Sequence, residues 1–244
     1  MAAYDAFAWF YERYWNEEFH SLAFPILERI WLPRLRPGSR ILDVCCGTGY
    51  LAALLAEKGY RVAGIDASRE MIAFARARVP TAEFQVAAAT DFRIAPRCDA
   101  AVSTFDSINH ILDPDGLRRA FRNIAASLKR GAPFVFDVLL EEAYLTRWGD
   151  GFSIVRDDHV LVINGTGFHP GSRIAECRLT LFRRIGNAWQ RADTIVHERC
   201  YSAAEIDEAL AGAGFTGTVC YDARDLGMGG TLGIGRTFYL ATKR

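Results

Sequence analysis

The sequence predicts an α/β protein built on a doubly wound, mostly parallel sheet of seven strands with helices on both faces. Two observations carry this prediction. Short apolar runs alternate with helical patterns from Arg40 to Leu140, and glycines follow the first run directly. Strands that alternate with helices favour a parallel sheet, because right-handed crossovers place the helices against its faces. A third observation, strand-like runs from about Asp150 to Arg199, adds an antiparallel β insertion.

The helices have start and stop signals. The aromatic-rich segment 4–35 predicts one or two helices, broken by Pro25 and Pro33. Asp113 and Pro114 suit the N-cap and the first position of the clearest helix, whose apolar residues recur at helical spacing. The other helices are expected around Leu51, Leu54 and Leu55 before Gly59, over 68–78 before Pro80, and over 202–211.

The strands divide into two groups. Continuous apolar runs predict buried parallel strands, and two runs near the C-terminus predict closing strands, with one antiparallel strand at the sheet edge. The insertion has three strand-like runs, separated by turn signals at Asn164-Gly165, Pro170-Gly171 and Gly186-Asn187. The expected ranges are 40–45, 61–65, 82–87, 99–105 and 134–140 in the core, 160–163, 174–183 and 189–196 in the insertion, and 215–221 and 236–242 at the end.

The composition argues against several classes of protein. The 244 residues include 29 Lys or Arg and 29 Asp or Glu, so the formal net charge is zero. This balance gives no electrostatic reason to expect a nucleic-acid or membrane partner. Residues 1–19 lack the continuous apolar stretch of a signal peptide. The six cysteines have no CxxC spacing, so we expect reduced thiols and a cytoplasmic location.

The most informative segment begins at Asp43 and continues through Cys45-Cys46-Gly47-Thr48-Gly49. A glycine-rich turn between a strand and a helix lets backbone amides approach a ligand at the helix N-terminus. The spacing up to Ala52, with Asp66 at the end of the second strand, also satisfies a loose dinucleotide fingerprint. The glycines alone therefore do not decide between ligands.

Asp43 distinguishes between two candidate ligands, a dinucleotide and S-adenosylmethionine. In a dinucleotide site it would lie beside the pyrophosphate, and two like charges about 4 Å apart repel by roughly 4 kcal/mol at a near-surface dielectric. S-adenosylmethionine instead carries an ammonium and a sulfonium group at that end, and the same carboxylate attracts both. The sequence therefore favours the methyl donor. A capping Asp beside a packing glycine is the purely structural alternative.

These residues resemble the class I S-adenosylmethionine-dependent methyltransferases, whose Rossmann-like fold agrees with the predicted sheet. The matching stretches are 41–49, 62–71 and 103–107, and the resemblance extends over essentially the whole chain. It implies that the chain is an enzyme that uses S-adenosylmethionine. A nicotinamide-dependent oxidoreductase and a non-catalytic protein that binds S-adenosylmethionine remain the alternatives.

The resemblance also implies roles for individual residues. Gly47 and Gly49 would pack against the methionine part of the cofactor, Asp66 would bind both ribose hydroxyls, and Met71 would cover the adenine. We expect Asp66 to be otherwise unpaired and to add little stability. The implied cofactor site further includes Tyr11, Asp43, Cys45, Ala67, Ala88, Ala89, Thr104 and Phe105.

Two residues depart from the family pattern. Cys45 stands where the first glycine is usual, which narrows the approach to the loop slightly. Ala88 stands where an acid usually contacts the adenine amino group, so adenine would depend on backbone groups near Ala88 and Ala89 and on apolar packing. Loss of a charged hydrogen-bond partner costs about 1.5–3 kcal/mol.

Within the family, the chain most resembles the N-methyltransferases of amino sugars. The resemblance rests on Tyr4-x-x-Phe7-Ala8-x-x-Tyr11, on the stretch 105–110 and on the place of the insertion. It implies that His110 and Tyr4 orient the acceptor and that Tyr11 closes over the cofactor. A histidine that titrates near neutrality suits an amine acceptor. A satisfied histidine at a helix entry and core aromatics of a docking helix are the structural alternatives.

The sequence thus predicts four parts: a helical lid at 1–38, a cofactor-binding core at 39–149, a β insertion over the acceptor pocket at 150–200, and a C-terminal helix with closing strands at 201–244. The acceptor would be a small molecule, with an amine as one candidate and nitrogen, oxygen and carbon methylation all open. No metal is expected. Asp106, Asp113 and Asp115 lack the Asp-Asn pair of metal-dependent catechol enzymes after the fifth strand, and Asp113 is explained as a helix cap.

Overall fold

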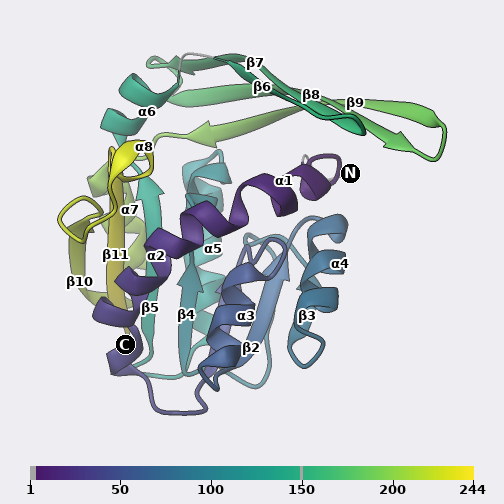
Figure 1. Ribbon diagram of the computed structural model, residues 1–244. Coiled ribbons are helices and arrows are strands. Elements are labelled where there is room, and N and C mark those ends of the chain that lie inside the picture. Colours follow the sequence, from purple (N-terminus) through teal and green to yellow (C-terminus); the bar gives the residue numbers. More distant parts are fainter. Residues whose placement is uncertain (1–3, 149–150) are drawn as a thin grey trace.

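The computed structural model describes residues 4–148 and 151–244 and has a central sheet of seven strands (Figure 1). The strands are β1 (Arg40–Val44), β2 (Arg61–Asp66), β3 (Glu83–Val86), β4 (Ala100–Ser103), β5 (Pro133–Leu139), β10 (Phe215–Asp222) and β11 (Arg236–Lys243). Their order is β10-β11-β5-β4-β1-β2-β3. The predicted seven-stranded, mostly parallel sheet is confirmed.

The reversed strand differs from the expectation. We expected an antiparallel strand at the edge, but β11 is the reversed strand and lies one position inside the edge. The edge strand β10 pairs antiparallel with β11 and therefore runs in the same direction as β5. The connection between β10 and β11, residues 223–235, contains α8 (Gly230–Gly233) and returns the chain antiparallel between β10 and β5.

Helices cover both faces of the sheet. They are α1 (Ala8–Tyr14), α2 (Asn16–Ile30), η1 (Leu32–Arg34), α3 (Tyr50–Glu57), α4 (Arg69–Arg78), η2 (Ser107–His110), α5 (Pro114–Ser127), α6 (Glu141–Arg147), α7 (Ala203–Gly212) and α8 (Gly230–Gly233). Successive strand residues point to opposite faces. Leu42 and Val44 accordingly belong to the core under α5 and α7, while Ile41 belongs to the core under α2 and α3.

The helix caps follow the sequence signals. The carboxylate of Asp113 accepts the N–H of Gly116 at 2.7 Å, and Pro114 is the first residue of α5, as predicted. Ser202 and Glu205 form a capping box at α7. The predicted break at Pro25 is wrong, because Pro25 lies inside α2. Pro25 and Ser21 are both exposed, so water can satisfy the carbonyl that a proline leaves without an amide partner.

A second sheet forms the predicted insertion. Its antiparallel strands are β6 (Phe152–Val155), β7 (His159–His169), β8 (Ile174–Ile185) and β9 (Ala188–Arg199). The turn predicted at Asn164-Gly165 is wrong: the segment lies within β7, where the register shifts between Asn164 and Thr166 as at a β-bulge. The expected start of the lid at residue 1 and the boundary between residues 149 and 150 lie outside the described residues.

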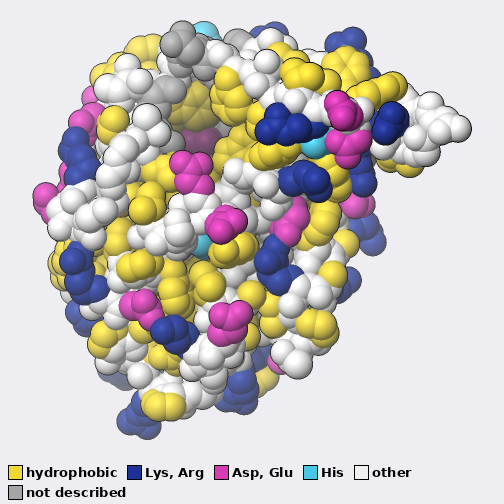
Figure 2. Space-filling view, in the orientation of Figure 1, with side chains coloured by type: hydrophobic (Ala, Val, Ile, Leu, Met, Phe, Trp, Pro, Cys, Tyr) yellow, Lys and Arg dark blue, Asp and Glu magenta, His cyan; other side chains and the backbone are white. Residues whose placement is uncertain are grey.

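The α1 helix lies between the carboxyl ends of the core strands and the insertion sheet (Figure 1). Basic and acidic side chains are interspersed on the face shown in Figure 2, in keeping with the zero net charge. No helix within the described ranges is long and apolar enough to cross a membrane. All six cysteines fall within those ranges, and each is a free thiol.

Candidate active site

A cavity of about 520 Å³ lies where β1, β2 and β4 end, beneath α1 and the insertion sheet. Its size is within the range of about 300–1,000 Å³ that is usual for small-molecule sites. The structure brings most of the predicted site residues to its wall: Tyr4, Tyr11, Cys45, Gly47, Asp66, Ala67, Met71, Ala88, Ala89, Phe105 and His110. Asp43, Gly49 and Thr104 are not among the described lining residues.

Gly49 has a packing role. Its φ of +76° is in the left-handed region, and a Cβ there would lie 2.9 Å from the Cα of Ala75 in α4. Only glycine allows α3 and α4 to approach this closely at that backbone angle. Gly47, at φ +53°, lines the cavity instead, below the ring of Tyr11.

Asp66 is held by the loop that it faces. Its Oδ2 accepts the N–H of Gly47 at 3.0 Å, and its Oδ1 accepts the N–H of Ser68 at 2.8 Å. The expectation that Asp66 is unpaired is therefore wrong, because a carboxylate at a strand end is well placed to accept amides of the following turn. Burial raises the pKa of Asp66, and the two N–H groups partly offset that rise.

Asp43 lies beneath the loop and is 2% exposed. Its Oδ2 has no hydrogen-bond partner within the described residues. Burial, reinforced by the charge of Asp66, raises the pKa of Asp43 to about 8. Any attraction between Asp43 and a cationic ligand would therefore act through the loop rather than by direct contact. Cys45, at the variant glycine position, has a left-handed φ of 58° and lines the cavity.

The adenine end agrees with an apolar contact. Met71 is 2% exposed and lines the cavity beside Ala88 and Ala89. Thr90, which the sequence reasoning missed, lines the same cavity two residues after Ala88. The cavity therefore brings together an acid at a strand end, a glycine loop and an apolar wall, the features from which the sequence predicts a site for S-adenosylmethionine.

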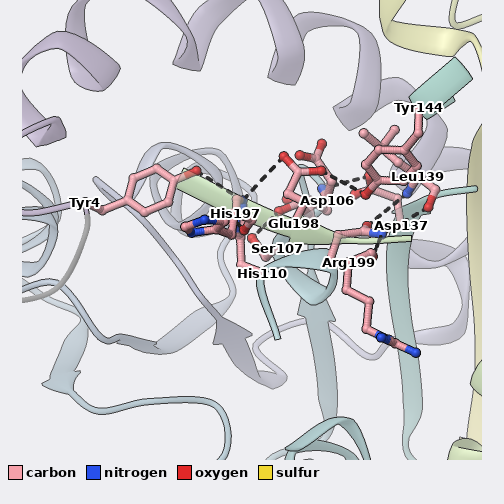
Figure 3. Close-up of polar contacts among 12 residues, drawn as sticks. Tyr4, Asp106, Ser107, His110, Asp137, Leu139, Tyr144, His197, Glu198 and Arg199 are labelled. Atoms are coloured by element: carbon pink, nitrogen blue, oxygen red, sulfur yellow. Dashed lines mark hydrogen bonds and ion pairs between the residues drawn. The ribbon is translucent and has the colours of Figure 1, made fainter. Parts of the chain in front are cut away.

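The opposite end of the cavity contains Tyr4 and His110 (Figure 3). The Tyr4 hydroxyl lies 3.0 Å from His110 Nε2, and His110 Nδ1 lies 2.9 Å from the carbonyl oxygen of His197. A carbonyl only accepts, so Nδ1 carries the proton. Burial lowers the pKa of His110 and raises that of Tyr4. The neutral Nε2 of His110 therefore accepts a hydrogen bond from the Tyr4 hydroxyl.

Glu198 and Tyr144 complete this end, and the sequence reasoning missed both. The Tyr144 hydroxyl donates to Glu198 Oε2 at 2.9 Å, and Glu198 Oε1 lies 3.9 Å from His110 Nε2 (Figure 3). Glu198 is 6% exposed. The alternation along β9 was the available signal, because Val196 and Glu198 share its buried face.

Asp106 enters the cavity from a tightly constrained loop. Phe105 and Asp106 have left-handed φ values of 63° and 49°. Their N–H groups donate to the carboxylate of Asp137 at 2.7 and 3.1 Å, and Arg236 Nη2 lies 2.6 Å from Asp106 Oδ1. Non-glycine residues adopt such angles only where surrounding contacts enforce them.

Asp106, His110 and Glu198 place one ligand-type atom each within 4.8 Å of one another. Such a set suits a bound cation, either a metal ion or an ammonium group. Arg236 already binds Asp106, and Tyr4 already occupies His110 Nε2. The arrangement present is therefore that of a polar cavity wall that favours positive charge.

Comparisons with known proteins define the class. Residues 41–131 match the family model of a methyltransferase domain. YqeM of Bacillus subtilis is named as a methyltransferase. It is 30% identical to this chain over 182 residues, and the alignment covers 72% of this chain and 73% of YqeM. The fold is that of an S-adenosylmethionine-dependent methyltransferase. The chain belongs to this methyltransferase family.

Two further proteins show where the similarity extends. The crystal structure of an S-adenosylmethionine-dependent methyltransferase from Clostridium acetobutylicum has the same fold, with a TM-score of 0.79, 22% identity and coverage of 99% of both chains. The dTDP-3-amino-3,4,6-trideoxy-alpha-D-glucopyranose N,N-dimethyltransferase of Streptomyces venezuelae is 29% identical over 125 residues, 51% of this chain and 53% of that protein.

Proposed function

We propose that this methyltransferase acts on a small-molecule acceptor through an amine nitrogen. The carrying observation is the acceptor end of the cavity, where Glu198 and Asp106 flank a neutral His110. Carboxylates stabilise an ammonium group and accept hydrogen bonds from a neutral amine. The similarity to an amino-sugar N,N-dimethyltransferase supports the same proposal.

We also propose a cytoplasmic location, with which the free thiols agree.

We assign the donor end to S-adenosylmethionine, which when bound supplies a methyl group on a positively charged sulfur. Asp66 would accept the ribose hydroxyls, with Met71, Ala67, Ala88 and Ala89 against the adenine. Gly47, Cys45 and Phe105 would border the methionine part, and Tyr11 would cover it from α1. Asp43, Gly49 and Thr104 lie outside the described lining and would support the wall by packing.

Tyr4 and His110 would orient the acceptor nitrogen. Since Nε2 accepts from Tyr4, the pair presents a fixed aromatic edge and one hydroxyl to the acceptor. Holding a nucleophile in line with the leaving sulfur supplies much of the rate enhancement in a displacement reaction. The neutral state of His110 avoids repulsion with a cationic amine.

A screen tests this function directly. The protein is incubated with S-adenosylmethionine and a panel of amines, amino sugars, phenols and hydroxylated aromatics, and mass spectrometry detects methylated products. We expect methylation of amines and calorimetric binding of S-adenosylhomocysteine, with NAD and NADP undetected. Cofactor binding without any methylated product would favour the non-catalytic alternative, and methylation confined to hydroxyl groups would overturn the amine assignment.

A further inference from the structure

The inner face of the insertion makes one wall of the acceptor region apolar. Ile163, Leu179 and Val196 line the cavity and are 9%, 3% and 7% exposed. Phe7 and Trp15 from the lid region continue this surface and pack against the same cluster. An apolar surface enclosed in this way is suited to an apolar part of the ligand, because each buried methylene contributes to affinity.

The charged groups of the cavity are mostly acids. Its described lining contains Asp66, Asp106, Asp113 and Glu198, against Arg119 as the one Lys or Arg. Arg236 does not line the cavity; its fully buried side chain lies between Asp106 and Asp137 and pairs with both. Such a wall attracts a cation and repels a phosphate, and the interaction strengthens where water is excluded.

Glu198 lies next to the apolar wall and lines the same cavity. It shares the buried face of β9 with Val196, so a ligand lying along that strand reaches its carboxylate. The Tyr144 hydroxyl, itself on a side chain 1% exposed, holds Oε2 at 2.9 Å. Glu198 Oε1 is turned toward His110, at the end of the cavity where the acceptor nitrogen belongs (Figure 3).

We infer that the acceptor is a cationic amine with an apolar body and without a phosphate group, and that Glu198 binds its nitrogen. This inference rests on the proposed function and narrows it. It also separates the chain from the relative that takes a nucleotide-linked sugar, whose pyrophosphate would meet an acidic wall. The apolar body lies against Leu179 and Val196, and the amine N–H groups donate to Glu198.

The same carboxylate serves the transfer step. The bound ammonium first releases one proton to water. The nitrogen lone pair then forms the N–C bond to the methyl carbon while the S–C bond breaks and its electron pair stays on sulfur. Positive charge thus moves from sulfur to nitrogen, and the product leaves as an N-methylammonium ion. A carboxylate fixed beside the nitrogen stabilises the charge that develops there.

Two probe series test the inference on protein loaded with S-adenosylhomocysteine. Calorimetry compares n-alkylamines from butylamine to octylamine with octyl phosphate. We expect affinity to rise by about fourfold per methylene, the fold-change that corresponds to roughly 0.8 kcal/mol. Octyl phosphate should bind at least tenfold more weakly than octylamine. Equal binding of the two octyl compounds, or no dependence on chain length, would overturn the inference.

Matched variants test the role of Glu198. Glu198→Gln should weaken octylamine binding at least tenfold while S-adenosylhomocysteine binding is retained. Asp193→Asn removes the same charge from the same strand, on an exposed side chain outside the described lining, and should change neither. Unchanged octylamine binding in Glu198→Gln would remove Glu198 from the amine site. Methylation of glucosamine 6-phosphate without alkylamine binding would refute this inference and leave the proposed function intact. Alkylamine binding without methylation of any amine would refute the proposed function and the identification of the bound amine as the acceptor, and would leave only amine binding by Glu198.

Discussion

Asp137 on β5 and Arg236 on β11 form an ion pair in which neither side chain is exposed to solvent. The pair does more than join two strands. Asp137 also accepts the N–H groups of Phe105 and Asp106, and Arg236 binds the carboxylate of Asp106. The loop that carries both left-handed residues is therefore anchored to two core strands, and the position of η2 with His110 depends on that anchor.

Replacement of Arg236 should be among the most damaging single changes. Arg236→Met leaves two acids without their cation, and breaking a buried pair by removing one partner typically costs about 3–5 kcal/mol. We expect a loss of this size in the free energy of unfolding, measured by urea denaturation. The control is Arg224→Met, which breaks solvent-screened pairs with Glu142 and Asp222 and should cost far less stability than Arg236→Met. Similar losses in the two variants would contradict the anchoring role.

The raised pKa of Asp43 predicts a pH-dependent stability. Its pKa of about 8 in the folded protein exceeds the ordinary value of 3.8, so the folded state keeps its proton where the unfolded chain releases it. Stability should therefore fall as the pH rises from about 4 to about 8, by up to ~1.4 kcal/mol per unit from this group. Asp43→Asn lacks the group and should lose this slope. Urea denaturation of both proteins at pH 5, 6.5 and 8 measures it, and parallel slopes would refute the assignment.

Asp66 should affect both the cofactor and the fold. Asp66→Asn removes the charge that would bind the ribose, and we expect weaker binding of S-adenosylhomocysteine by about 1.5–3 kcal/mol in calorimetry. Some stability is also lost, because the amide cannot accept equally well from both Gly47 and Ser68.

A matched control separates these two effects. Asp222 also ends a strand and accepts the N–H of the residue two positions on, Arg224, at 2.8 Å. Asp222→Asn should lower stability slightly and leave the cofactor affinity unchanged. If both variants bound S-adenosylhomocysteine as tightly as the natural protein, Asp66 would have no part in the cofactor site.

Tyr4 and His110 should act as one unit. Because they share one hydrogen bond, Tyr4→Phe and His110→Asn should each lower turnover, by roughly 100- to 10,000-fold, and the double variant should be little worse than His110→Asn. Cofactor affinity should stay unchanged. Tyr14→Phe is the control, because Tyr14 binds His159 and lies outside the described lining. Additive losses in turnover would show that the two residues act independently.

The core was predictable because its signals are local. Alternating apolar runs, the Asp113 cap and the glycine loop each specify structure within a few residues. Local patterns gave two wrong predictions. Pro25 does not end the helix, because it lies on the exposed side of α2, and Asn164-Gly165 is not a turn, because it lies at a bulge within β7. The short elements η2, α6 and α8 went unpredicted, because fewer than eight residues give little periodicity.

The site divides in the same way. Most of the predicted cofactor residues follow strand ends of the core, and they line the cavity. Glu198 and Tyr144 come together from β9 and α6, 54 residues apart in the chain. No local pattern links them, since their meeting depends on how the insertion folds back over the core.

The insertion leaves the core after α6 and returns to it before α7. The side-chain amide of Asn109 donates to the carbonyl oxygens of Leu139, at the end of β5, and Arg199, at the end of β9, and so joins the two ends of the insertion. One continuous segment therefore supplies the apolar wall from Ile163 to Glu198, while the core and the lid region supply Asp106, His110 and Tyr4. Substitutions within the insertion would reshape that wall and leave the strand ends with Asp66 and Gly47 unchanged.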